Sequence, residues 1–127
     1  MKSEELYEVK LYLGQLRSRM QEGFQAINYI RKGELANQIG KFQDSYEGIT
    51  IPVRITDTTF VSGQRYSENG WEVAAISYPK IGQSHEQTLK FMLDLGDYLL
   101  EKFLQNRICV LDNYSKTTGR TYMLEPQ

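Results

Sequence analysis

The stretch from Ser84 to Leu111 reads SHEQTLKFMLDLGDYLLEKFLQNRICVL, and it decides the fold class. Ser84 followed three residues later by Gln87 forms a capping box, which predicts that a helix begins here. Apolar positions then recur at steps of three and four and share one helical face: Leu89, Met92, Gly96, Leu99 and Phe103. The apolar run that follows predicts a strand. We therefore expect a central helix over residues 84–105, packed in the core.

Upstream of this helix the apolar period changes to two, which is typical of β-strands. Residues Ile49 to Ile55 alternate apolar and polar side chains and predict a strand. Asn69-Gly70 is a favoured hairpin turn, so it should join a strand near Phe60–Tyr66 to one over Trp71–Tyr78. Downstream of the helix, residues 107–113 and 120–125 predict two more strands.

The N-terminal residues from Ser3 to Arg31 predict a long amphipathic helix, because their apolar residues keep a heptad-like spacing. Gly23 lies on this stripe, so we expect the helix to cross the central helix where Gly23 meets Gly96. The stripe either rests on the protein's own sheet or joins two copies of the chain. The residues that would carry such self-association are Leu6, Val9, Leu13, Leu16 and Met20.

A second helical segment follows Gly33, and its relation to the first helix is left open by the sequence. The expected element order is therefore α-α-β-β-β-α-β-β. It corresponds to one α+β domain over residues 1–127, with a helical N-terminal segment over 1–45. Residues 49–125 would form an antiparallel sheet of about four to five strands together with the central helix.

The composition excludes several classes of protein. The chain has 127 residues, 40% of them apolar and 24% charged, which is typical of a globular domain. Its net charge of −1 disfavours general binding to nucleic acid or to anionic membranes. One cysteine, Cys109, and no long apolar segment fit the reducing cytoplasm of a cell or of an infected host cell.

No motif in the sequence specifies a chemistry, so we predict no catalytic residue, metal ligand or cofactor. The single histidine, His85, follows the helix cap and is expected to be exposed on the first turn. Asp94, Asp97 and Glu101 share one side of the helix. A metal ion needs several oxygens that point to one position, and side chains along a straight helix do not provide that arrangement. We expect them to form the solvated side of the helix.

The predicted sheet contains the one group of residues, tyrosines and arginines above all, that indicates a binding surface. Aromatic rings can stack on bases and arginines can contact phosphates, as in proteins that hold single-stranded nucleic acid or nucleotides. The chain has nine tyrosines, which are also ordinary strand residues. The candidates for this surface are Arg54, Arg65, Tyr66, Trp71, Tyr78, Tyr114, Lys116, Arg120 and Tyr122.

The sequence favours a small non-catalytic protein that acts through protein–protein contacts, in assembly or inhibition, and that is encoded by a phage or mobile element. We expect a protein partner and a homo-oligomer, most readily a dimer. The alternative function is binding of single-stranded nucleic acid or of a nucleotide-like ligand through the Tyr- and Arg-bearing sheet.

Overall fold

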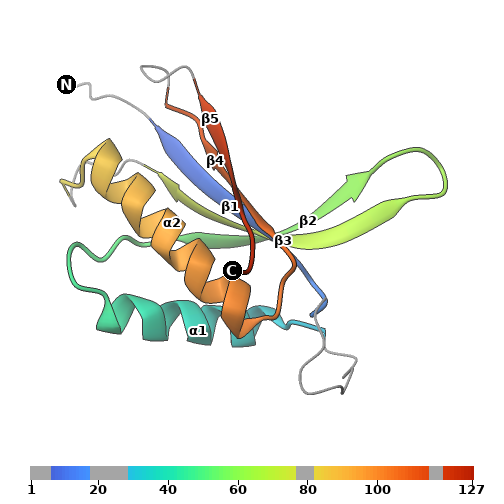
Figure 1. Cartoon of the computed structure of the whole chain (residues 1–127), viewed down its shortest axis with the longest axis horizontal. Helices are drawn as coiled ribbons and strands as arrows, with labels where there is room; N and C mark the ends of the chain where they lie inside the picture. The colour runs from blue at the N-terminus through green and yellow to red at the C-terminus, as the bar shows by residue number, and fades with distance from the viewer. Residues whose placement is uncertain (1–6, 18–28, 77–81, 115–118) are drawn as a thin grey trace.

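The computed structural model describes residues 7–17, 29–76, 82–114 and 119–127, in which two helices pack on one face of a five-stranded antiparallel sheet (Figure 1). The strands pair in the order β2-β3-β1-β4-β5, so β1 is the central strand. The elements in chain order are β1 (Glu8–Gly14), α1 (Lys32–Ser45), β2 (Arg54–Val61), β3 (Ser67–Ile76), α2 (His85–Lys102), β4 (Ile108–Asp112) and β5 (Arg120–Leu124).

The predicted long N-terminal helix is wrong, because its described part forms β1. Burial alternates along the strand: Val9 and Leu13 lie in the core, whereas Lys10 and Tyr12 face the other side of the sheet. β1 pairs with β3 on one side and β4 on the other, which satisfies its backbone groups in the centre of the sheet. Of the other proposed self-association residues, Leu16 is exposed, and Leu6 and Met20 lie outside the described residues.

The predicted Asn69-Gly70 turn is also wrong, because both residues lie inside β3 and pair with β2. The hairpin turns earlier, where the Ser62 amide donates to the Tyr66 carbonyl at 3.0 Å. Gly70 serves a close approach instead: a Cβ there would stand 2.8 Å from the carbonyl oxygen of Leu13 on β1. This close approach explains why residue 70 is a glycine, although it does not lie in a turn.

The strand predicted over residues 49–55 is mostly absent, since β2 begins only at Arg54. Pro52 has no amide hydrogen to donate to a ladder, which fits its place before the strand. Two strands, not three, therefore separate α1 from α2, and the expected order is replaced by β-α-β-β-α-β-β. The predicted α+β class agrees with the structure, whereas the predicted order of helices and strands does not.

Helix α2 matches the sequence closely. The Gln87 amide donates to Ser84 Oγ at 3.1 Å and the Ser84 amide donates to Gln87 Oε1 at 2.8 Å, so the capping box is present. Gly96 faces the sheet, where an added Cβ would lie 2.5 Å from Leu124 Cδ1. It allows a close helix–sheet contact, whereas the predicted helix partner Gly23 lies outside the described residues.

The core lies between the helices and one face of the sheet. Fully buried residues from both helices, three central strands and the segment before β2 meet there, and they include Val9, Leu35, Ile51, Val73, Leu95 and Val110. The β2–β3 hairpin extends beyond this body as a projecting arm (Figure 1). Among the described residues, no helix is long and apolar enough to cross a membrane.

Candidate functional site

The face of the sheet opposite the helices is the open face of the described chain. Because side chains alternate along a strand, each buried core residue is followed by one that points to this face. The open face is apolar near the base of the β2–β3 arm and charged near the start of β1. Its principal residues are Glu8, Lys10, Tyr12, Arg54, Phe60, Glu72, Cys109, Leu111, Thr121 and Met123.

A hollow of about 870 Å³ opens on the apolar part of this face. The rings of Tyr12 on β1 and Phe60 on the arm meet edge to face, with centroids 5.4 Å apart and planes at 73°. Cys109 and Met123, which are paired across β4 and β5, continue the apolar floor. Burial raises the pKa of the Cys109 thiol, so this side chain stays uncharged at neutral pH. Two exposed charges, Glu68 and Arg107, also line the hollow.

Two buried glutamines fix the wall of this first hollow. Gln105 accepts from the Gly14 amide at 2.9 Å and donates to the Leu16 carbonyl at 3.0 Å, which ties the end of β1 to the loop after α2. Gln15 donates to Asp57 Oδ1 at 2.7 Å. Because these amides have protein partners, the wall is held in place before any ligand enters.

A second hollow of about 460 Å³ adjoins the first along the same face. Tyr12 and Leu111 line both hollows, so the two form one depression, which we call the trough. Like the first hollow, the second has more apolar than polar surface, and charged residues line it as well. Its lining is Lys10, Tyr12, Leu111, Asp112, Asn113, Gly119, Arg120 and Thr121.

An ion-pair network borders the trough on the side of β2 and β3. Lys10 lies 3.0 Å from Glu8 and 3.4 Å from Glu72, and Arg54 lies 2.6 Å from Glu8. Burial would raise the pKa of Glu8, but hydrogen bonds from Arg54 and Lys10 outweigh it and lower the pKa. The hydrogen bond to Glu8 is the main cause of a raised pKa for Lys10. Burial, followed by the charge of Glu72, raises the pKa of Tyr12.

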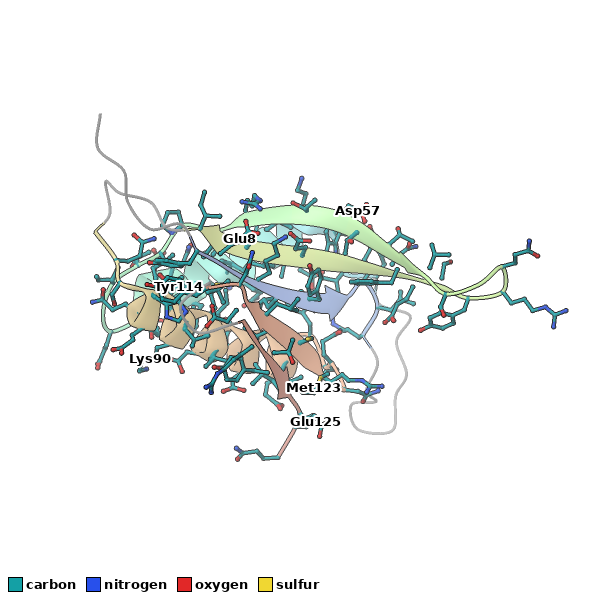
Figure 2. All side chains as sticks on the ribbon, turned by 90° about the horizontal axis from the view of Figure 1, so that it is seen from above. Glu8, Asp57, Lys90, Tyr114, Met123 and Glu125 are labelled. Carbon is teal, nitrogen blue, oxygen red and sulfur yellow. The ribbon has the colours of Figure 1, made fainter. Side chains whose placement is uncertain are left out.

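The expectation of an exposed His85 is wrong. Its side chain is 12% exposed and its Nε2 lies 2.7 Å from Asp112 Oδ2. Tyr114 stacks on the imidazole with a centroid distance of 4.3 Å, and Tyr7 packs edge-on against both rings. Tyr114 and Met123 lie toward opposite ends of the sheet (Figure 2), so this cluster is remote from the apolar hollow.

The structure does not gather the predicted Tyr- and Arg-bearing residues into one surface. Trp71 is buried and donates to the Ile30 carbonyl at 2.9 Å, and Tyr122 packs against the core. Arg65 and Tyr66 are exposed on the arm. Tyr114 stacks on His85 and Arg54 lies on the open face, whereas Arg120 pairs with Asp112 and starts from the opposite face of the sheet. The remaining two, Tyr78 and Lys116, lie outside the described residues.

Sequence reasoning missed the residues that shape the trough. Tyr12 was assigned to a helix, and Phe60 was assigned to a strand with no role. Cys109 was used only as a sign of a reducing compartment, whereas its side chain is half-buried on the open face. The alternation in β1 was the available signal for Tyr12. In the described residues, no group of three or more His, Cys, Asp or Glu side chains could hold a metal ion.

No family model and no curated protein matches the sequence. Two solved structures share the fold. A phage SAM lyase in complex with S-methyl-5'-thioadenosine matches 98% of this chain and 92% of its own, with a TM-score of 0.64 and 13% identity. A phage SAM lyase in the apo state matches 95% of this chain and 90% of its own, with a TM-score of 0.60 and 18% identity.

The chain has the fold of these phage SAM lyases. The predicted non-catalytic assembly or inhibitory protein is therefore contradicted, because the proteins that share this fold over nearly the whole chain are enzymes. The expectation of a phage-related α+β protein agrees with the same comparison. At 13% and 18% identity the likeness establishes the fold.

Proposed function

We propose that this protein is a lyase that cleaves SAM (S-adenosylmethionine) and releases S-methyl-5'-thioadenosine. The observation that carries the proposal is the match of nearly the whole chain to a SAM lyase that holds this thioether. The trough supports it, because its two adjoining hollows combine apolar surface with charged residues. SAM combines the same two kinds of group, with an adenosyl group at one end and a charged amino acid at the other.

The proposed reaction needs neither water nor a cofactor. One carboxylate oxygen of SAM attacks the γ-carbon of the methionyl chain and forms a carbon–oxygen bond. The electron pair of the bond between that carbon and sulfur passes to sulfur, and the sulfonium becomes a neutral thioether. The products are S-methyl-5'-thioadenosine and homoserine lactone. No proton is transferred, so the protein has to supply position and environment instead of an acid or base.

The apolar surface of the first hollow offers part of the environment that this step needs. One positive and one negative charge disappear in the reaction, so a site that excludes water favours the transition state over the charged substrate. Tyr12 and Phe60 offer ring faces to the adenine and to the sulfonium, which cation–π attraction would hold. The raised pKa of Cys109 keeps its thiol neutral, so it would not compete as a thiolate for the sulfonium carbons.

Incubation of the purified protein with SAM tests the proposal directly. Mass spectrometry should detect S-methyl-5'-thioadenosine together with homoserine lactone, or homoserine after the lactone hydrolyses. In H₂¹⁸O the freshly formed lactone should contain no ¹⁸O, whereas direct hydrolysis would label homoserine from the first turnover. Absence of thioether release above the rate in buffer would overturn the proposed activity. Glu47→Gln changes an exposed glutamate that lines neither hollow, so this control variant should remain active.

Self-association remains part of the proposal, but residues other than those predicted from the sequence would carry it. Val9 and Leu13 are buried in the sheet and cannot join two copies. Exposed Leu16, Phe60 and Met123 instead form an apolar rim around the first hollow, which a second copy would cover. Light scattering on the Leu16→Glu variant should show a lower mass than the parent. An unchanged mass of one chain for both proteins would contradict self-association. We place the protein in the host cytoplasm, where SAM is available.

A further inference from the structure

We propose that Glu72 is a positioning residue of the trough, which holds the Tyr12 hydroxyl and so fixes the ring that lines both hollows. This inference rests on the proposed function and adds a residue that lines neither hollow itself. The substrate would contact the Tyr12 ring, and Glu72 would act on the substrate only through that ring.

The register of the sheet places the two side chains together. Glu72 on β3 and Tyr12 on β1 are directly opposite each other. Both lie on the open face, because their chain neighbours Val73 and Leu13 point into the core. Directly opposite residues of an antiparallel pair have Cβ atoms about 4.5–5.5 Å apart, so their side chains interact. The Tyr12 hydroxyl donates a hydrogen bond to the Glu72 carboxylate.

The acceptor of this hydrogen bond is itself held in place. The Glu72 side chain is 16% exposed, and its Oε1 lies 3.4 Å from the Lys10 ammonium. Lys10 lies in turn 3.0 Å from Glu8 on the same strand. Burial, followed by the charge of Glu72, raises the pKa of Tyr12, so the hydroxyl stays protonated and able to donate. Glu72 therefore offers the hydroxyl a fixed partner before any ligand enters.

The Tyr12 ring is held from two other strands. Phe60 on β2 packs against the ring edge to face, with centroids 5.4 Å apart, and Glu72 on β3 holds the hydroxyl. Phe60 supports the ring through apolar contact, whereas Glu72 supports the polar end. With both contacts present, the ring offers one defined surface to a thioadenosyl group in the trough.

A direct attraction between Glu72 and the sulfonium is the alternative role. Two observations disfavour it: Glu72 lines neither hollow, and the Lys10 ammonium at 3.4 Å offsets its charge. The two roles differ for Glu72→Gln, which removes the negative charge but retains a carbonyl oxygen as acceptor. Positioning needs the acceptor, whereas direct attraction needs the charge.

Titration with S-methyl-5'-thioadenosine tests the inference, because this ligand does not react. Glu72→Ala should weaken its binding by about three- to tenfold, since a half-buried hydroxyl without an acceptor draws the ring toward water. Glu72→Gln should remain within about twofold of the parent. The double variant Tyr12→Phe/Glu72→Ala should also recover to within about twofold, because no hydroxyl is left to satisfy. Thermal melting of each variant separates a loss of fold from a loss of position.

Glu125→Ala is the matched control, since it removes an exposed glutamate that follows β5 and lines neither hollow. It should leave the affinity unchanged. The inference is overturned if Glu72→Ala binds like the parent, if Glu72→Gln is as weak as Glu72→Ala, or if the double variant does not recover. In those cases thioether binding by the parent would still support the proposed function.

Two results with the parent separate the inference from the proposed function. A parent that binds the thioether without cleaving SAM would overturn the proposed activity, while the recovery in the double variant would still support the role of Glu72 in holding the ring. A parent that binds no thioether would overturn both.

Discussion

The imidazole Nε2 of His85 lies 2.7 Å from Oδ2 of Asp112, and this contact joins the first turn of α2 to the last residue of β4. The Asp112 side chain is 1% exposed, and its Oδ1 accepts a hydrogen bond from the Tyr114 amide at 3.2 Å. The carboxylate therefore satisfies a side chain and a backbone group at one end of the sheet. This makes it a structural residue at the border of the second hollow.

We expect Asp112→Ala to destabilise the fold. The change leaves the His85 imidazole and a backbone amide without their acceptor, which costs about 1–3 kcal/mol of the free energy of unfolding. Urea denaturation followed by circular dichroism measures the effect. Asp112→Asn retains one acceptor oxygen and should lose less. Equal midpoints for the parent and the alanine variant would show that the contact adds nothing to stability.

Gly70→Ala should destabilise the central sheet. The new Cβ would stand 2.8 Å from the Leu13 carbonyl oxygen, and a backbone atom cannot move aside without disturbing the β1–β3 pairing. A loss of about 1–3 kcal/mol is expected from such overpacking. Gly33→Ala is the control in α1, where nothing lies within 4 Å of an added Cβ. The free energy of unfolding of that variant should rise by about 0.5–1 kcal/mol. A similar loss of stability in both variants would refute the steric explanation.

The ion-pair network should make stability depend on pH in the acid range. The folded protein holds the pKa of Glu8 below its ordinary value of 4.5, so the stabilisation is present above that value and is lost as the pH falls through the lower folded pKa. Glu8→Gln should flatten the decline of the unfolding free energy below pH 4.5. Glu47→Gln, which changes an exposed glutamate outside the network, should leave the decline intact. Parallel curves for the Glu8 variant and the parent would contradict this role.

Tyr12→Ala should slow thioether release from SAM, because the trough loses the ring that lies between its two hollows. A cation–π contact of this kind corresponds to about three- to thirtyfold in kcat/KM. Tyr12→Phe retains the ring and should keep most of the activity. A phenylalanine variant as slow as the alanine variant would assign the effect to the hydroxyl instead. Thermal melting of both variants shows whether the fold is preserved.

The sequence predicted α2 well because its signals are local. The Ser84–Gln87 capping box and the apolar stripe after it both lie within the helix itself. In β1, by contrast, local patterns conflict. Val9, Leu13 and Leu16 follow helical steps, whereas Tyr7, Val9, Leu11 and Leu13 follow strand steps. The strand prevails because pairing with β3 and β4 on both sides satisfies its backbone, and those partners lie far away in the chain.

The candidate site could not be predicted from the sequence either, because it also depends on strands that lie far apart in the chain. Tyr12, Phe60 and Cys109 meet on one face only through the registers of four strands. Asn69-Gly70 has the composition of a turn, yet Gly70 is required by the close approach of β1. A single sequence contains no record of which strands are neighbours. The residues that shape the trough therefore look like ordinary strand residues until the sheet is assembled.

The central position of β1 has a consequence for how the protein is made. This strand is synthesised before its neighbours β3 and β4, which begin about 60 and 100 residues later in the chain. A nascent chain that ends before residue 108 has no partner for one side of its middle strand. The sheet must therefore close after most of the polypeptide is synthesised, and topologies with such distant pairings fold slowly. Until then an apolar strand with unpaired edges is exposed to other nascent chains.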